Sequence, residues 1–159
     1  MQENPQISKV QSPKEKNDFL SFIAITLLIV LPIRLFIAQP FIVNGASMVP
    51  SFQSGDYLIV DEITFRLRDP KRNEVIIFKY PKDPSKYFIK RIIGLPGDTV
   101  DGIILTASQY FVEGDNRNAS SDSRIWGPVE RKLIIGRPIA RLLPVGQLGL
   151  LPGDGVEIK

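Results

Sequence analysis

The sequence of 159 residues contains no cysteine and no histidine. Without cysteine, the chain can form no disulfide, no thiolate nucleophile and no cysteine-ligated metal site. Without histidine, it can hold neither a Ser-His-Asp triad nor a histidine-ligated zinc ion. Any hydrolytic chemistry must therefore take its general base from lysine, aspartate or glutamate.

Several common motifs are also missing. The sequence has no GxxxxGK[ST], no GxGxxG, no HExxH, and no serine followed by lysine three residues later. The sequence has 20 Lys and Arg residues and 17 Asp and Glu residues, which gives a formal net charge of +3. The basic residues are spread along the chain. Because nucleic-acid binding usually requires a basic stripe with a recognisable motif, we expect no nucleic-acid partner.

One long uncharged run, FLSFIAITLLIVLPI, covers residues 19–33. As a helix it would be about 22 Å long, short of the ~30 Å hydrocarbon core of a bilayer. Continuing to Ala38 brings it near the ~20 residues that a span needs, with Arg34 reaching the far interface. We therefore expect a transmembrane anchor over residues 18–38. The alternatives are a cleaved signal peptide, for which a convincing small-x-small cleavage site is missing, and a buried core helix.

The segment before this run indicates the orientation of the chain. Residues 1–17 are polar and carry Lys9, Lys14 and Lys16, so we expect a flexible tail that the positive-inside rule places in the cytoplasm. Residues 39–159 would then form an extracytoplasmic domain. The expected location is the plasma membrane, crossed once, with membrane lipid as a partner.

Beyond residue 39 the pattern is typical of a β domain. Asp101-Gly102, between apolar neighbours, predicts a hairpin over 99–104. With 13 prolines and 12 glycines as punctuation, we expect a mainly β fold, compact and mostly antiparallel or barrel-like. Further strands are predicted by β-branched and aromatic runs at residues 40–43, 57–60, 74–80, 87–94, 110–112 and 133–136.

A serine stands among small residues in Gly45-Ala46-Ser47, just past one of these strands. Small neighbours allow a substrate backbone to approach closely, and a bend leaves backbone N–H groups free to face an oxyanion. An ordinary turn leading into Pro50 explains the same residues.

Lys90 is the second unusual residue. Alternation along a strand puts Lys90 on one face with Phe88 and Ile92, while Arg91 points to the other face. Lysine can act as a general base only when neutral, which requires its pKa to fall by about 3 units, and burial can supply this. A Ser–Lys pair in an apolar pocket thus needs no histidine. The alternative is a solvated lysine on an edge strand.

The third segment, residues 114–127, interleaves acidic and basic residues with hydrogen-bonding groups. It is compatible with a solvated loop or with a fixed network that holds a site together. A calcium loop is disfavoured because Arg117 falls where a ligand oxygen is needed. The glycosylation motif at Asn118 is expected by chance.

Together these segments resemble the type I signal peptidase (leader peptidase) family. The family's nucleophile box is similar to residues 45–50, its lysine box to 90–98, and its last box to 114–124, all after a single anchor. The resemblance covers roughly residues 19–140. Only residues 99–113 separate the last two boxes, so this chain is similar to a minimal form that lacks the large insertion of some members.

The resemblance implies roles for individual residues. Ser47 is the expected nucleophile and its backbone N–H an oxyanion donor, Lys90 is the expected general base, and Ser120 is expected to orient Lys90. Many members have a second oxyanion donor, a serine hydroxyl two positions before the nucleophile. This chain has Gly45 at that position, which carries no hydroxyl. The ion-pair network behind the site is expected to comprise Asp122, Arg124 and Arg91. The shallow pockets for small side chains are expected to be formed by Phe41, Val43, Gly45, Phe52 and Ile89.

The implied function is a membrane-bound serine endopeptidase. It would remove the signal peptides of exported preproteins after small-x-small sites, through an acyl-enzyme and without a metal or cofactor. We expect a monomer whose β domain rests on the membrane. One rival is a self-cleaving repressor-type Ser–Lys protease, which should carry a DNA-binding segment in place of the anchor. Another is an anchored β module that binds peptides without cleaving them.

Overall fold

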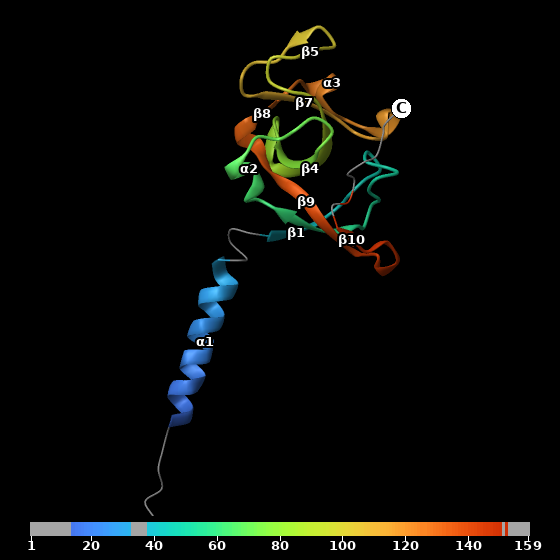
Figure 1. Ribbon diagram of the computed structural model, residues 1–159. Helices are drawn as coiled ribbons and strands as arrows, with labels where there is room; N and C mark the ends of the chain where they lie inside the picture. The colour runs from blue at the N-terminus through green and yellow to red at the C-terminus, as the bar shows by residue number, and fades with distance from the viewer. Residues whose placement is uncertain (1–13, 33–37, 151, 153–159) are drawn as a thin grey trace, which may run out of the picture.

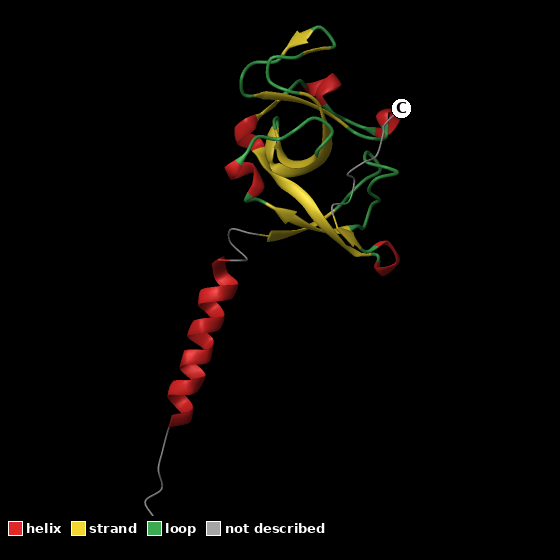
Figure 2. Ribbon diagram, in the orientation of Figure 1, coloured by secondary structure: helices red, strands yellow, loops and turns green. Residues whose placement is uncertain are grey.

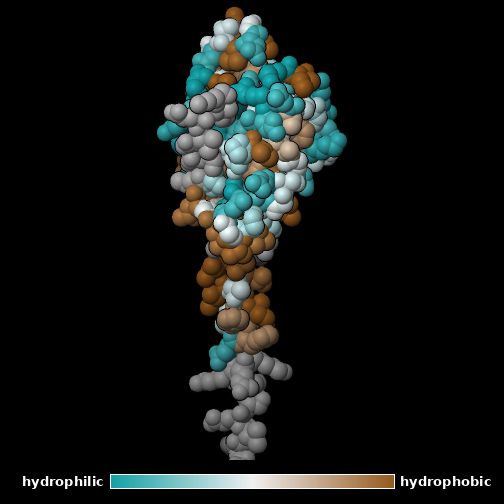
Figure 3. Space-filling model, turned by 90° about the vertical axis from the view of Figure 1, so that its right-hand side faces the viewer, coloured by the Kyte–Doolittle hydropathy of each residue, from teal (hydrophilic) through white to brown (hydrophobic). Residues whose placement is uncertain are grey.

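A computed structural model describes residues 14–32, 38–150 and 152 of the chain (Figure 1). The first element is the helix α1 (Lys14–Pro32), whose large apolar side chains from Phe19 to Val30 are all exposed. Figure 3 shows these hydrophobic residues along the helix, whereas the visible face of the β domain is mostly hydrophilic. Among the described residues, no helix combines the length and hydropathy of a membrane span. Part of the predicted anchor, residues 33–37, and most of the predicted tail, residues 1–13, lie outside the described residues.

The remainder of the described chain is mainly antiparallel β structure, which confirms the β part of the predicted fold class. The strands are β1 (Ala38–Ile42), β2 (Tyr57–Asp61), β3 (Val75–Tyr80), β4 (Asp83–Gly94), β5 (Thr99–Val100), β6 (Ile103–Ile104), β7 (Gln109–Glu113), β8 (Val129–Glu130), β9 (Ile134–Leu143) and β10 (Gly149–Leu150). Short helical turns are α2 (Thr64–Leu67), η2 (Arg117–Ala119), α3 (Ser123–Trp126), η3 (Arg131–Leu133) and η4 (Val145–Gln147).

Eight of these strands form one strongly curved sheet in the order β1-β2-β9-β3-β4-β7-β8, with β10 paired to β9 (Figure 2), and β5 and β6 form a separate two-stranded sheet. The long strand β9 joins its two halves, because one part of β9 pairs with β2 and another with β3. On the side of β4 that faces β7, the pairing covers only Arg91 to Gly94. Among the described residues, no strand pairs with the preceding part of β4 on that side.

Two sequence predictions can be compared with the strands directly. The hairpin at 99–104 is present as β5 and β6, with positive φ angles of 50° at Asp101 and 77° at Gly102. The predicted strand at 133–136 was too short, since β9 continues through Pro138 to Leu143. A register shift at Ile59/Val60 lies opposite this proline, and such a bulge accommodates a residue that has no N–H to donate.

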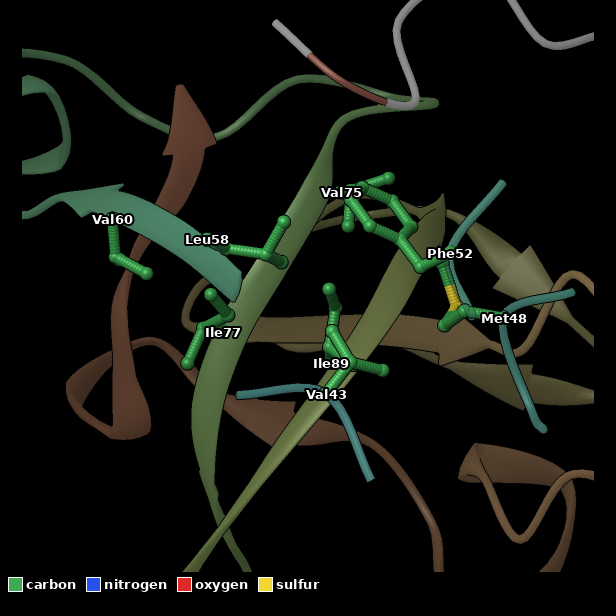
Figure 4. Close-up of a cluster of buried hydrophobic side chains, with 8 residues drawn as sticks. All are labelled: Val43, Met48, Phe52, Leu58, Val60, Val75, Ile77 and Ile89. Carbon is green, nitrogen blue, oxygen red and sulfur yellow. The ribbon is translucent and has the colours of Figure 1, made fainter. Parts of the chain in front are cut away.

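The hydrophobic core has two clusters. One, drawn in Figure 4, lies beneath the segment that contains Ser47, and Met48 and Phe52 of that segment are 1% and 0% exposed. Burial of a Met or Phe side chain contributes about 1.5–3 kcal/mol, so these two side chains hold the serine segment against the sheet. The other cluster surrounds Phe78 between β3, β7 and α3.

Candidate active site

Ser47 lies in a turn that is fixed from several directions. Gly45 enters it with a φ of 97°, a conformation that favours glycine. Within the turn, the N–H of Val49 donates to the Ala46 carbonyl at 3.2 Å, and that of Phe52 donates to the Met48 carbonyl at 2.9 Å. These bonds and the buried side chains on either side leave Ser47 half-exposed at the surface of the core.

The carbonyl of Ser47 is held by the third sequence segment. The N–H of Asn116, which follows β7, donates to this carbonyl at 2.9 Å. The Ser47 N–H itself donates no hydrogen bond within the described residues, whereas the N–H of Gly45 donates to the Ser54 hydroxyl at 3.3 Å. Ser47 therefore keeps a backbone donor that an oxyanion could use, and its role as an oxyanion donor stays a prediction.

Lys90 extends from β4 to the serine. Its Nζ lies 2.6 Å from Ser47 Oγ and donates to the Ile89 carbonyl at 3.0 Å. The side chain is 4% exposed, and its ammonium group lies 5.5 Å from the ring centre of Phe88. Because Lys90 is buried, the alternative of a solvated lysine on an edge strand does not apply.

The surroundings of Lys90 lower its pKa. Burial lowers the pKa of Lys90 from its ordinary 10.5 to about 8, against the opposing negative charges of Asp122 and Asp115. Roughly a tenth of the side chain is then neutral at pH 7 and about half at pH 8. This is the form in which a lysine accepts a proton.

Asp122 and Arg124 form an ion pair near this site. Both guanidinium nitrogens Nε and Nη2 of Arg124 donate to the carboxylate, at 2.8 and 2.9 Å, and the N–H of Gly114 donates to it at 3.1 Å. Burial alone would raise the pKa of Asp122, but the hydrogen bonds from Arg124 and Gly114, the nearby Ser120 hydroxyl and the charge of Arg124 together lower it to about 2. The structure thus joins Asp122 and Arg124 as predicted.

The membership of Arg91 in the network of Asp122 and Arg124 stays a prediction. Arg91 pairs with Asp115, with Nε to Oδ1 at 2.9 Å and Nη2 to Oδ2 at 2.7 Å, and both side chains are 1% exposed. Alternation explains this, because Arg91 points to the face of β4 opposite Lys90. The Ser51 hydroxyl also donates to Asp115. Sequence reasoning did not single out Asp115, although it stands in the last box directly after Gly114.

Ser120 is half-buried beside these groups, with its hydroxyl oxygen turned away from solvent. Its hydroxyl makes no hydrogen bond of normal geometry within the described residues, although it is close enough to Asp122 to lower the pKa of that carboxyl. The Ser120 Oγ also lies against Gly114, where it would clash with the Cβ atom of any larger residue. The structure does not place Ser120 in a hydrogen bond with Lys90, so its role toward the lysine stays a prediction.

A cleft of about 400 Å³ opens in front of the serine and lysine. Of the predicted substrate-binding residues, Phe41, Gly45 and Ile89 line it, but Val43 and Phe52 are buried in the core behind its wall. Alternation could not distinguish a wall from the layer beneath it. Sequence reasoning missed other residues of the lining, which also includes Ile42, Asn44, Ala46, Lys86, Tyr87, Phe88, Ala119 and Ser121.

Known proteins are similar in sequence to this chain over most of its length. The profile of the family described as "Signal peptidase, peptidase S26" matches residues 16–103 and 101–143. The chain belongs to this signal peptidase family. It is 37% identical to the "Probable signal peptidase I-2" of Synechocystis, over 92% of this chain and 83% of the relative. It is 32% identical to "Signal peptidase I" of Leptolyngbya laminosa, over 92% and 89%. It is also 32% identical to "Mitochondrial inner membrane protease subunit 1" of Homo sapiens, over 68% and 71%.

Membership of the peptidase S26 family makes the chain a serine endopeptidase, as the sequence predicted. The family profile matches in two pieces that meet at residues 101–103, the turn between β5 and β6. The alignment with the Synechocystis signal peptidase spans 182 positions and is longer than this chain. Both findings agree with a short form of the family, in which little chain separates the lysine box from the last box.

Proposed function

We propose that this protein removes signal peptides from exported preproteins by a Ser47–Lys90 dyad that acts through an acyl-enzyme. The observation that carries the proposal is the 2.6 Å distance between Lys90 Nζ and Ser47 Oγ, together with burial that lowers the pKa of Lys90 to about 8. A lysine in this environment can take the serine proton near neutral pH without help from histidine.

The mechanism follows from the donors around the two residues. Neutral Lys90 accepts the proton of the Ser47 hydroxyl while Ser47 Oγ forms a bond to the scissile carbonyl carbon. The unengaged N–H of Ser47 donates to the oxyanion. The ammonium form of Lys90 then gives its proton to the leaving amine as the peptide bond breaks. Neutral again, Lys90 activates a water molecule that hydrolyses the ester on Ser47 and restores the hydroxyl.

The cleft supports an extended peptide as the substrate. Within the part of the chain that the structure describes, β1 is the terminal strand of the sheet and β4 before Arg91 is paired on one side only. Both therefore offer backbone groups beside the cleft. A peptide added to such an edge forms main-chain hydrogen bonds and turns alternate side chains to the same wall. Bulky residues Phe41, Phe88 and Ile89 form part of this wall. Only small side chains would then fit at the first and third positions before the scissile bond.

We also propose that α1 and the residues that follow it anchor the protein in the plasma membrane. A helix that is apolar on all sides, as α1 is from Phe19 to Val30, is typical of burial in protein or lipid. Lysines before it place the N-terminus in the cytoplasm and the β domain outside. Ser47 and Lys90 come from one chain, so a monomer can hold the whole dyad. Protease protection in sealed, right-side-out membrane vesicles tests the orientation. Added protease should digest the β domain of intact vesicles, and digestion only after lysis would contradict the proposed orientation.

The test of function is cleavage of a purified preprotein with an Ala-x-Ala signal peptide by the full chain in detergent, read by mass spectrometry. Wild type should cut after the second Ala, and substrates with Leu at either Ala position should be cut far more slowly. Ser47→Ala should abolish cleavage, and Ser121→Ala, which changes another serine of the same cleft, is the matched control that separates nucleophile from lining. A folded wild type that binds the preprotein but cuts no substrate would favour the non-catalytic module instead.

A further inference from the structure

Arg141 lies on β9 directly behind the serine turn. Its backbone is held on both sides, opposite Leu58 of β2 and Gly149 of β10. Its side chain is only 12% exposed, and its Nε forms an ion pair of 3.0 Å with the buried carboxylate of Asp56. Nη1 donates to the Gln147 side-chain oxygen at 2.9 Å. The guanidinium is therefore fixed in place before it contacts the serine turn.

Two further interactions of the Arg141 side chain are with the segment that follows Ser47. Nη2 donates to the backbone carbonyl of Ser51, and the guanidinium carbon lies 5.2 Å from the ring centre of Phe52. Asp56 takes part as well, because its carboxylate accepts the N–H of Gln53 at 3.0 Å. One arginine thus holds the backbone, a ring and the end of this segment at once.

These contacts complete a clamp around the nucleophile. On the catalytic side, Arg91 and Asp115 contact the hydroxyl of Ser51, and the Asn116 N–H holds the carbonyl of Ser47. On the opposite side, Arg141 holds the same residue, Ser51, through its carbonyl. The turn from Ser47 to Ser51 is fixed between these two groups of contacts.

We infer that Arg141 is a positioning residue that sets the distance between the Ser47 hydroxyl and Lys90. This inference rests on the proposed role of Ser47 as nucleophile. Proton transfer depends on the 2.6 Å separation of Ser47 Oγ and Lys90 Nζ, and a displacement of about 1 Å can slow an enzymatic reaction about 100-fold. The planar guanidinium serves several separate acceptors, which a lysine ammonium in its place could not do.

The experiment compares Arg141→Gln and Arg141→Lys with a matched variant, Arg137→Gln, in the full chain. Arg137 lies on the same strand, β9, and is also paired, with Glu74 at 3.3 Å and Asp61 at 3.8 Å, but within the described residues neither partner contacts the serine turn. Steady-state cleavage of an Ala-x-Ala substrate gives kcat and KM, and thermal unfolding gives Tm. Cleavage is measured well below the lowest Tm of the set.

Arg141→Gln should lower kcat by about 10- to 100-fold with KM close to wild type, and Arg141→Lys should recover part of kcat. Arg137→Gln should lower Tm to a similar extent and keep kcat. Equal kcat in Arg141→Gln and Arg137→Gln, with active wild type, would overturn the inference while the proposed function stands. If Arg141→Gln does not fold, Arg141→Lys decides: unchanged kcat in this folded variant also overturns the inference. A wild type that is inactive, or a Ser47→Ala variant that is active, counts against the proposed function instead.

Discussion

Replacing Lys90 by methionine should stabilise the protein while abolishing its activity. Methionine has a similar length and carries no charge, so it removes the need to bury an ammonium group. Burial lowers the pKa of Lys90 from 10.5 to about 8, and each pKa unit corresponds to about 1.4 kcal/mol. The charged lysine therefore costs the folded state about 3 kcal/mol. Loss of its hydrogen bonds to Ser47 and Ile89 offsets about 1 kcal/mol, which leaves a gain of about 2 kcal/mol.

The dependence of this gain on pH identifies its origin. Below pH 8 both folded and unfolded states of the wild type carry the proton, and the full cost of the buried charge is present. Between pH 8 and 10.5 the unfolded chain still binds a proton that the folded protein has lost, so the stability of the wild type rises with pH. The advantage of Lys90→Met should therefore be largest at pH 7 and should shrink toward pH 10.5.

Urea unfolding of the full chain in detergent, followed by fluorescence of its single tryptophan, Trp126, measures the effect. Lys86→Met makes the same chemical change on β4 at a side chain that is 65% exposed, and it should leave stability nearly unchanged. A Lys90→Met variant that is less stable than wild type at pH 7 would refute the reasoning. So would a stability difference that stays constant from pH 7 to 10.5.

Two other predictions concern the groups that support the dyad. Asp122→Asn removes a negative charge that raises the pKa of Lys90, so the rise of kcat/KM with pH should move to lower pH. A pH–rate series on the variant measures this shift, and a midpoint at or above that of wild type counts against the electrostatic role of Asp122. Gly114→Ala places a methyl group against the Ser47 carbonyl, so it should lower the free energy of unfolding in urea by about 1–3 kcal/mol and remove much of the activity. Gly146→Ala, which has open space at its Cβ, should change neither quantity, and equal behaviour of the two variants contradicts the packing argument.

The sequence was sufficient for the strand pattern and for the pairing of Ser47 with Lys90. Strand alternation correctly placed Lys90 and Arg91 on opposite faces of β4, because the period of two is a property of the backbone itself. The hairpin at Asp101-Gly102 was predictable for a similar reason, since local sequence determines this turn.

Other features depend on contacts that local patterns do not contain. Alternation indicates that Arg91 leaves the face of Lys90, but the choice between Asp115 and Asp122 as its partner depends on how the segment after β7 folds back. Val43 and Phe52 were assigned to the cleft wall through the family resemblance, and the structure shows both side chains in the buried layer behind that wall. Arg141 is far in sequence from the segment that it holds, and no motif connects the two.

The central claim is that neutral Lys90 is the base that activates Ser47, and the dependence of kcat/KM on pH tests it most directly. The substrate would be a peptide with an Ala-x-Ala site and no ionisable group near the scissile bond, measured from pH 5 to 10 with the full chain in detergent. The rate should rise with one ionisation near pH 8 and level off above it, since kcat/KM reports the free enzyme and its proton acceptor must be neutral. A profile that is flat between pH 5 and 9 would contradict the assignment of Lys90 as the base.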